Sequence, residues 1–300
     1  LNLCSGSTNT IGLNSGNNLN YSWTPSNGIA DTSQNPATIN LSNNGLSIFN
    51  QIYTLTSIDT LTGCFNQDTT TVFIFPKPSI TLAKTSDTIC SGDTIYRSFI
   101  NNYGGVKGNW ILLNKSSFGV NSISSQQNVD SLQLKLESTS ATQNAVFNFA
   151  IIPNIQGCFG DTFYYQAIVR PTPQLSIYNS TPKVCNDDSS QIFVSSSIPN
   201  TVINWYSNSS SLSGGSGSTI NQKITNSGNL SDTIIYFIQG NYKGCISTLD
   251  TTSVVALPAP NFSVSPSQQS ICSGNQTGIT ISNSQSLLFN FTILSQDTFI

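Results

Sequence analysis

The sequence predicts an all-β protein built from tandem antiparallel β-sandwiches. Three observations predict it: short segments with apolar residues at alternate positions, turn residues roughly every eight to twelve positions, and a set of landmarks that recurs along the chain. Each repeat holds a cysteine, a tryptophan, a Gly-Cys pair and a Pro-x-Pro triplet, in that order. No stretch shows a sustained helical period, so we expect negligible helix.

The landmarks divide the 300-residue chain into domains, because the first cysteines recur every 86 to 95 residues. We expect sandwiches at residues 1–77, 78–172 and 173–259, and part of a fourth at 260–300. The first is expected to lack part of its N-terminal strand, and the chain to be a segment of a longer polypeptide. The landmarks are Cys4, Trp23, Gly63-Cys64 and Pro76-Lys77-Pro78; Cys90, Trp110, Gly157-Cys158 and Pro171-Thr172-Pro173; Cys185, Trp205, Gly244-Cys245 and Pro258-Ala259-Pro260; and Cys272 with Phe291.

The third repeat illustrates the expected order of elements in its first half. An alternating segment at 175–177 predicts the opening strand, and the first cysteine is expected in the loop that follows it. A polar turn at 186–188 precedes a second strand marked by residues 192–194. The strand at 202–205 then carries the tryptophan.

The second half of the repeat completes the sandwich. A β-branched and aromatic segment at 234–238 predicts the penultimate strand, which turns through the Gly-Cys loop into a final strand at 253–257. The Pro-x-Pro triplet ends that strand because proline cannot donate to a sheet ladder. About seven short strands in roughly 90 residues, with a tryptophan on a middle strand, are typical of an immunoglobulin-like sandwich.

The cysteines predict disulfides and an oxidising, extracytoplasmic compartment. The chain has seven cysteines and no histidine, and the long spacings do not fit a zinc site. We expect one disulfide in each repeat, tying two loops at one end of the sandwich, with Cys272 paired outside the segment. The expected pairs are Cys4 with Cys64, Cys90 with Cys158, and Cys185 with Cys245.

Composition excludes several function classes. Charged residues make up 8% of the chain and the net charge is −3, which argues against nucleic-acid binding. No apolar run approaches the roughly 20 residues that span a bilayer, so we expect no membrane insertion. Without histidine and with Glu137 as the single glutamate, the segment is not expected to be an enzyme. Trp23, Trp110, Trp205 and Phe291 are expected core residues rather than sugar-stacking platforms.

Two segments could carry other roles. Asn186-Asp187-Asp188 offers oxygen ligands for calcium, although such a run is more often a solvated turn, and no other cofactor is expected. The glycine-rich segment 214–218 has no phosphate-binding context and is expected to be a flexible loop at the tip of the third domain.

The first repeat also resembles a known class of repeats. The segments Tyr21-Ser-Trp-Thr-Pro-Ser-Asn-Gly28, Asn35-Pro-Ala-Thr38, Tyr53-Thr-Leu-Thr56 and Gly63-Cys64 are similar to the PKD-like and Ig-like repeats of very large surface proteins of Bacteroidota. These include gliding-motility adhesins exported by the type IX secretion system. The resemblance implies an extracellular, cell-surface location.

The same resemblance implies O-glycosylation at a serine or threonine that follows aspartate and precedes a small or aliphatic residue. An alternative interpretation is that Asp-Thr is simply a good transition from turn to strand. The candidates are Thr60, Thr69, Thr88, Thr94, Ser131, Thr233 and Thr251.

Two function classes follow. In the first, the chain is a structural segment of a surface adhesin, stalk or filament that spaces and presents adhesive parts, with stiff Pro-x-Pro junctions. Its partners would be a surface polysaccharide or another surface protein, and self-association into a fibre is a further option. In the second, the repeats are spacers or carbohydrate-binding modules of a secreted enzyme.

Overall fold

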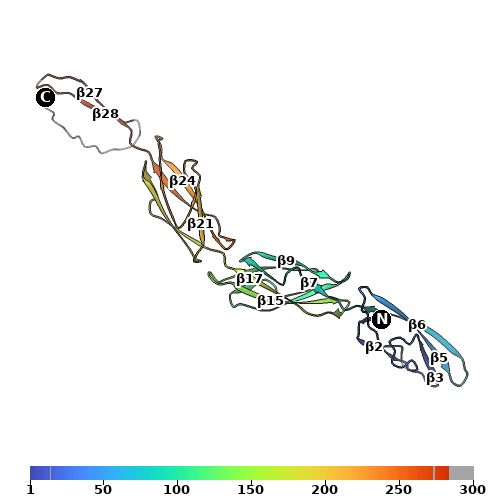
Figure 1. Ribbon diagram of the computed structural model, residues 1–300. Coiled ribbons are helices and arrows are strands. Elements are labelled where there is room, and N and C mark those ends of the chain that lie inside the picture. The colour runs from blue at the N-terminus through green and yellow to red at the C-terminus, as the bar shows by residue number, and fades with distance from the viewer. Residues whose placement is uncertain (14, 273, 284–300) are drawn as a thin grey trace. The chain divides into compact units, whose positions relative to one another are not determined.

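The computed structural model describes residues 1–13, 15–272 and 274–283. Within this part of the chain the regular elements are strands β1 to β28, with no α-helix (Figure 1). The expected all-β class with immunoglobulin-like sandwiches in tandem is confirmed. The chain forms two compact units, Leu1–Pro171 and Thr172–Ile300. The finer boundaries of the four domains stay a prediction.

The first repeat, in the first unit, has a four-stranded sheet and a two-stranded one. In spatial order the larger sheet is β1 (Asn2–Cys4), β6 (Phe65–Phe75), β5 (Phe49–Asp59) and β3 (Leu19–Thr24), and the smaller is β2 (Thr8–Ile11) with β4 (Ala37–Asn40). Strand β4 buries alternate side chains, Ala37 and Ile39, against Trp23 and Tyr53. This alternation creates the core between the two sheets.

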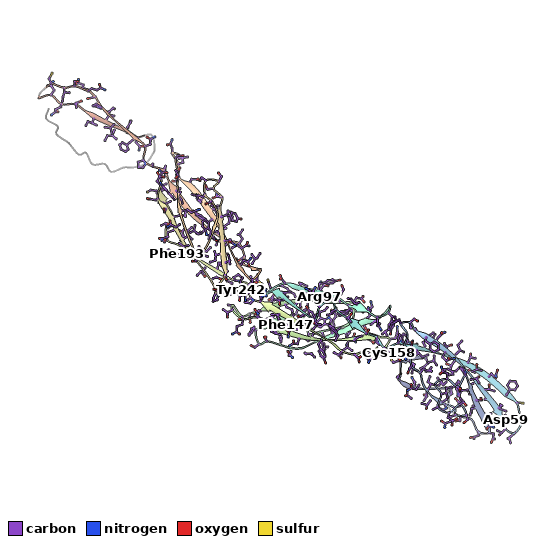
Figure 2. All side chains as sticks on the ribbon, in the orientation of Figure 1. Asp59, Arg97, Phe147, Cys158, Phe193 and Tyr242 are labelled. Carbon is purple, nitrogen blue, oxygen red and sulfur yellow. A yellow bond between two sulfur atoms is a disulfide. The ribbon has the colours of Figure 1, made fainter. Side chains whose placement is uncertain are left out.

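The second repeat contains the largest apolar cluster of the first unit. Its strands are β7 (Ile80–Thr81), β8 (Ser86–Cys90), β9 (Thr94–Ser98), β10 (Ile100–Asn101), β11 (Lys107–Lys115), β12 (Gly119–Asn121), β13 (Ser125–Val129), β14 (Ser131–Ser138), β15 (Ala145–Ile155), β16 (Cys158–Phe159) and β17 (Phe163–Arg170). The main sheet has the order β13-β11-β15-β17-β8, and β12-β14-β9 lies on the other side of the core. Leu132, Leu134 and Leu136 on β14 belong to the same buried cluster as Phe147 on β15, which is labelled in Figure 2.

The third repeat, in the second unit, has the same two-sheet plan. Its strands are β18 (Leu175–Asn179), β19 (Lys183–Cys185), β20 (Ser189–Ser196), β21 (Val202–Ser207), β22 (Gly215–Ser216), β23 (Thr219–Lys223), β24 (Asp232–Tyr242), β25 (Cys245–Ile246) and β26 (Asp250–Leu257); β27 (Phe262–Pro266) and β28 (Ile279–Asn283) form a hairpin after them. The sheet orders are β19-β26-β24-β21-β22 and β18-β20-β23.

The glycine-rich segment of the third repeat is not the flexible tip that we expected. Strand β22 pairs with β21, with Gly215 opposite Trp205. A Cβ atom on Gly215 would lie 2.5 Å from the Trp205 ring, so glycine is required for the backbone to lie on the indole.

One parallel pair in each repeat corrects the expected all-antiparallel sheets. The opening segment is split in two, and its second half, ending at the first cysteine, runs parallel to the last strand. These pairs are β1 with β6, β8 with β17, and β19 with β26. The first cysteines lie opposite Phe75, Arg170 and Leu257, at the end of a strand and not in a loop. We call this end of a repeat its tail end, and the end with the Gly-Cys hairpin its head end.

The tryptophans lie on the strands before the penultimate ones. Trp23 on β3 and Trp110 on β11 are buried, and Trp205 on β21 is half-buried and packs against the core of the third repeat. Trp205 meets Tyr236 edge to face, with ring centroids 6.4 Å apart. Phe291 lies outside the described residues.

Candidate functional site

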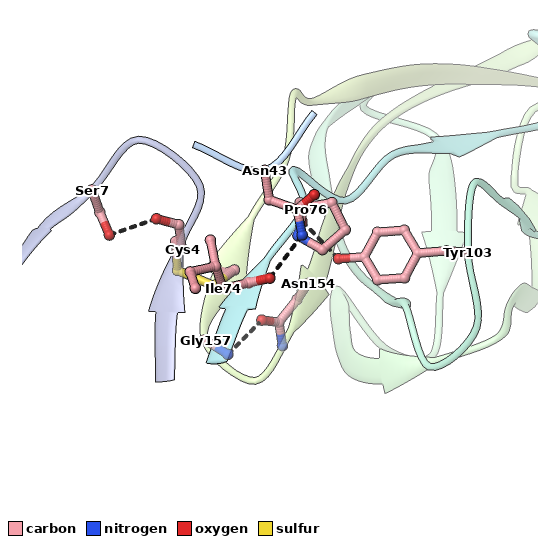
Figure 3. The surroundings of a disulfide bond; sticks show 9 residues. Cys4, Ser7, Asn43, Ile74, Pro76, Tyr103, Asn154 and Gly157 are labelled. Carbon is pink, nitrogen blue, oxygen red and sulfur yellow. Dashed lines mark hydrogen bonds between the residues drawn. A yellow bond between two sulfur atoms is a disulfide. The ribbon is translucent and has the colours of Figure 1, made fainter. Parts of the chain in front are cut away.

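The structure contains a disulfide between two successive repeats. Cys4, at the tail end of the first repeat, is bonded to Cys158 at the head end of the second, with Cα atoms 5.3 Å apart and 154 residues between them in sequence (Figure 3). Cys90 and Cys245 are also disulfide-bonded, whereas Cys64, Cys185 and Cys272 are exposed free thiols.

All three pairings expected within repeats are therefore wrong. Cys4 and Cys158 bond each other, which excludes Cys4 with Cys64 and Cys90 with Cys158, and the free thiol of Cys185 excludes its pairing with Cys245.

The physical reason is the length of the strands. Strand β6 runs 11 residues from the head end to Phe75, the residue opposite Cys4. At about 3.3 Å per residue it separates the two ends by roughly 35 Å, whereas a disulfide needs Cα atoms within about 7 Å. Figure 2 shows the same separation, with Asp59 at one end of the first repeat and Cys158 beside the other. The 11-residue strands β15 and β24 separate the cysteines of the other repeats in the same way.

A tight hairpin presents Cys158. Gln156 and Gly157 connect β15 to β16 with φ angles of 47° and 85°, the left-handed values that two-residue hairpins require. The Gly157 amide donates to Asn154 Oδ1 at 3.2 Å (Figure 3). The third repeat uses Lys243 and Gly244 in the same way, with φ angles of 50° and 91°. The glycine of the Gly-Cys motif is thus explained by backbone conformation.

Apolar packing surrounds the disulfide. Phe75, the last residue of β6 in the first repeat, is 5% exposed and belongs to the same apolar cluster as Trp110 of the second repeat. Cys158 is 3% exposed in that cluster, and Cys4 packs against it. The core of the second repeat therefore continues into the end of the first. We call Cys4, Phe75, Pro76, Tyr103 and Cys158 the joint.

Hydrogen bonds fix the Pro-x-Pro segment at the joint. The Tyr103 hydroxyl donates to the Pro76 carbonyl at 2.7 Å, and Asn102 Nδ2 donates to the Lys77 carbonyl at 3.2 Å. Burial raises the pKa of Tyr103, so its hydroxyl stays a donor at neutral pH. Gly160 approaches the Pro78 carbonyl so closely that a Cβ atom there would lie 1.8 Å from the oxygen.

A second polar network lies inside the second repeat. Asp87 on β8 has a side chain only 8% exposed and forms an ion pair with Arg97 at 2.5 Å. The Tyr165 hydroxyl donates to the same carboxylate at 2.5 Å. The hydrogen bond from Arg97 lowers the pKa of Asp87, and burial raises the pKa of Tyr165. The network joins β8 to β9 across the two sheets.

The calcium candidate forms a turn on the surface of the third repeat. Asp187 has φ of 68° and lies 3.2 Å from Lys223 Nζ, and its other oxygen accepts a hydrogen bond from Asn186 Nδ2 at 3.0 Å. In the described parts of the chain, no group of three His, Cys, Asp or Glu side chains could hold a metal ion. The described part of the chain also includes no helix long and apolar enough to cross a membrane.

The glycosylation candidates are mostly accessible. Ser131 is half-buried, and the other six are exposed: Thr60, Thr69, Thr88, Thr94, Thr233 and Thr251. Four of the seven Asp-Ser/Thr pairs, at 93–94, 130–131, 232–233 and 250–251, lie where strands β9, β14, β24 and β26 begin. Both interpretations of the Asp-Thr pattern thus stay open.

A hollow of about 470 Å³ lies beside Trp23 in the first repeat. Tyr21, Asn35 and Asp68 contribute to its lining. Asn35 is 9% exposed, and its Oδ1 atom accepts no hydrogen bond in this structure. The hollow therefore offers an aromatic ring, an amide oxygen and a carboxylate to a polar ligand.

Comparisons with known proteins find solved structures of low similarity. No protein-family model matches the chain, and no curated protein matches it. Similar solved structures include the titin I-band fragment I67–I69 (10% identity, TM-score 0.39, 86% of this chain and 94% of that one) and the N-terminal eight Ig domains of DSCAM (9%, 0.40, 89% and 37%). The human desmocollin-1 ectodomain is another (11%, 0.34, 94% and 65%). These values are too low to carry an argument, so the fold rests on the sheet orders and registers above.

Sequence reasoning missed the joint because it placed the first cysteine in a loop. The usable signal was the pair of β-branched residues, Thr88 and Ile89, directly before Cys90, which favours a short strand ending at the cysteine. No comparable signal in the sequence indicates the roles of Tyr103 and Gly160, which depend on contact with the Pro-x-Pro segment.

Proposed function

We propose that the chain is a structural repeat segment of an extracellular adhesin, stalk or filament, in which successive repeats are fastened to resist tension. The observation that carries the proposal is the joint, where a disulfide, a buried phenylalanine and a buried proline from neighbouring repeats meet. A linker meant for free movement would instead be polar and exposed.

The covalent path explains how such a segment would resist pulling. Tension applied at the two ends of the first unit passes from Cys4 to Cys158 through the sulfur atoms and bypasses the residues between them. In the chain-entropy model, closing a loop with this separation of 154 residues contributes about 5 kcal/mol against unfolding. The bypassed residues include most of both sandwiches.

Force spectroscopy tests this function. The test uses a Cys90→Ser background, because Cys90 is disulfide-bonded as well and its bond would also limit the extension. With the Cys4–Cys158 bond intact, pulling this chain to full extension should leave the 154-residue loop closed, and adding reductant should lengthen it by about 500 Å. Adding Cys158→Ser should give the longer extension without reductant. Cys64→Ser is the matched control because Cys64 is a free thiol, and it should behave as the parent chain. Equal extensions before and after reduction would refute a tension-bearing role.

The disulfides also support an extracellular, surface-exposed setting, because such bonds persist in oxidising compartments. Within this proposal the chain has no catalytic role, and its partner is a surface polysaccharide or another surface protein. Type IX secretion, gliding motility, self-association into a fibre and O-glycosylation of the exposed threonines belong to the same proposal. Intact-mass measurement of the native protein would detect the glycans directly.

A second candidate function, carbohydrate binding by a module of a secreted enzyme, is favoured by the hollow beside Trp23. Binding should retard the chain in gels containing a surface polysaccharide. Asp68→Ala should abolish the retardation, because its carboxylate lines the hollow, while the exposed Asp130 outside it provides the control Asp130→Ala. Retardation that both variants lose equally, or no retardation on any polysaccharide tested, contradicts this alternative.

A further inference from the structure

Two free cysteines occupy the positions that the joint uses. Cys64 follows Gly63, which has φ of 73°, at the head end of the first repeat, as Cys158 follows Gly157 in the second. Cys185 ends β19 opposite Leu257, as Cys4 ends β1 opposite Phe75. Both thiols are exposed. By position, therefore, Cys64 corresponds to Cys158 and Cys185 corresponds to Cys4.

Exposed apolar side chains surround Cys64, as at a protein-binding surface. Leu61, in the loop that leads to Cys64, is 79% exposed, and the neighbouring Ile58 and Phe65 are exposed too. The loop is held in shape without a partner, because Asp59 Oδ1 accepts hydrogen bonds from the Leu61 and Thr62 amides at 2.8 and 3.0 Å. A preformed loop with apolar side chains and a thiol is suited to docking.

The surroundings of Cys185 provide the complementary shape. An apolar hollow of about 240 Å³ lies beside it, lined by Cys185, Leu257, Pro258 and Pro260 among others. Leu257 and Pro258 stand where Phe75 and Pro76 stand at the joint of the first repeat. At that joint the corresponding positions are buried against the hairpin of the next repeat. The hollow is thus the same docking surface without its hairpin.

We propose that Cys185 and its hollow form a docking site for the Gly-Cys hairpin of another repeat of this kind, and that Cys64 belongs to such a hairpin. The proposed pairing follows the bond between Cys4 and Cys158, in which the first cysteine of one repeat bonds the Gly-Cys cysteine of another. Repeats joined in this way are covalently linked. The inference concerns how repeats join, so it holds whether the array serves as a stalk or as a spacer.

The bond forms by thiol–disulfide exchange with a small disulfide such as oxidised glutathione. The Cys64 thiolate attacks one glutathione sulfur and releases the other as thiolate, giving a mixed disulfide. The Cys185 thiolate then attacks the Cys64 sulfur and releases the second glutathione. One protein disulfide forms, the glutathione disulfide is reduced by two electrons, and the two protons lost by the cysteines go to the two glutathione thiols.

The chain itself provides the probe, because it carries both Cys64 and Cys185. The 300-residue protein is incubated at rising concentration with oxidised and reduced glutathione, and crosslinked peptides are identified by mass spectrometry. The expected result is head-to-tail oligomers in which Cys64 of one copy bonds Cys185 of another. Cys272 is also a first cysteine and a free, exposed thiol, but in the described residues it ends no strand and lines no apolar hollow, so it is the internal control for a cysteine without the docking surface. Cys64–Cys185 bonds should exceed Cys64–Cys272 bonds roughly tenfold, which corresponds to about 1.4 kcal/mol of docking.

Variants separate docking from thiol reactivity. Cys272→Ser should leave the oligomers unchanged and Cys64→Ser should abolish them. Leu61→Ser should reduce the Cys64–Cys185 bond while the rate at which a small maleimide labels Cys64 stays the same. Crosslinks spread evenly over the three thiols, bonds between like cysteines, or thiols that stay free in the exchange buffer would each overturn the proposal.

Discussion

The Gly-Cys hairpins of the first and second repeats carry the same two residues in opposite states. Cys158 is 3% exposed and bonded to Cys4, and its hairpin is a two-residue turn. Cys64 is exposed and free, in a longer loop whose Asp59 side chain caps the turn. We infer from this difference that a Gly-Cys cysteine becomes buried and bonded when the tail end of another repeat contacts its hairpin. The other cysteine of its own repeat does not decide this.

Removing the phenylalanine that crosses the joint is the largest expected perturbation. Phe75→Ala should lower the free energy of unfolding of the second repeat by about 3–5 kcal/mol, because the side chain is buried in the cluster that contains Trp110. Urea unfolding followed by tryptophan fluorescence measures it. Phe73→Ala, on the same strand but 42% exposed, is the control and should cost far less. Equal losses of unfolding free energy in the two variants would mean that Phe75 does not stabilise the second repeat across the joint.

The Asp87 network tests the interior of the second repeat separately from its joint. Asp87→Asn should cost about 1.5–3 kcal/mol, because it replaces charged hydrogen bonds to Arg97 and Tyr165 with neutral ones. The pKa of Asp87 is lower in the folded protein than in the unfolded chain, so its contribution is complete above the unfolded pKa of about 3.9. It is lost as pH falls through the folded pKa.

Acid unfolding checks the sign of that linkage. Stability of the parent chain should fall more steeply below about pH 4 than stability of Asp87→Asn, so the two curves should converge in acid. The exposed Asp161 offers the control Asp161→Asn, which should leave the slope unchanged. Parallel curves for the parent and Asp87→Asn would show that the ion pair does not stabilise the fold.

Gly160→Ala tests how closely the Pro-x-Pro segment fits the head end of the second repeat beside the joint. The added methyl group would lie 1.8 Å from the Pro78 carbonyl oxygen, so the backbone must shift, at a cost of about 1–3 kcal/mol. Differential scanning calorimetry should show a lower unfolding temperature. Gly104→Ala is the matched control, since a Cβ atom there meets nothing within 4 Å. No change in either variant would mean that the close approach does not hold the joint in place.

The fold was largely predictable from the sequence, whereas the joint was not. Alternating side chains such as Leu132, Leu134 and Leu136 identify strands because burial on one face follows the two-residue period. The position of each cysteine relative to the ends of a strand depends on whether β1 and β8 run parallel or antiparallel to their partners, and no local pattern specifies that direction. The hydrogen bond from Tyr103 to Pro76 depends in turn on two repeats meeting.

Breaking the exposed ion pair beside the joint should have the smallest effect on stability. It tests how much charge contributes to holding the first two repeats together. Lys77 Nζ lies 2.6 Å from Asp161 Oδ1, but the two side chains are 61% and 88% exposed. Water and salt screen such a pair, so Lys77→Ala should change the free energy of unfolding by less than about 1 kcal/mol. Lys183→Ala, at another exposed lysine, is the control. A loss above about 2 kcal/mol that disappears in high salt would show that charge, and not the packing of Phe75 and the disulfide, fastens the first repeat to the second.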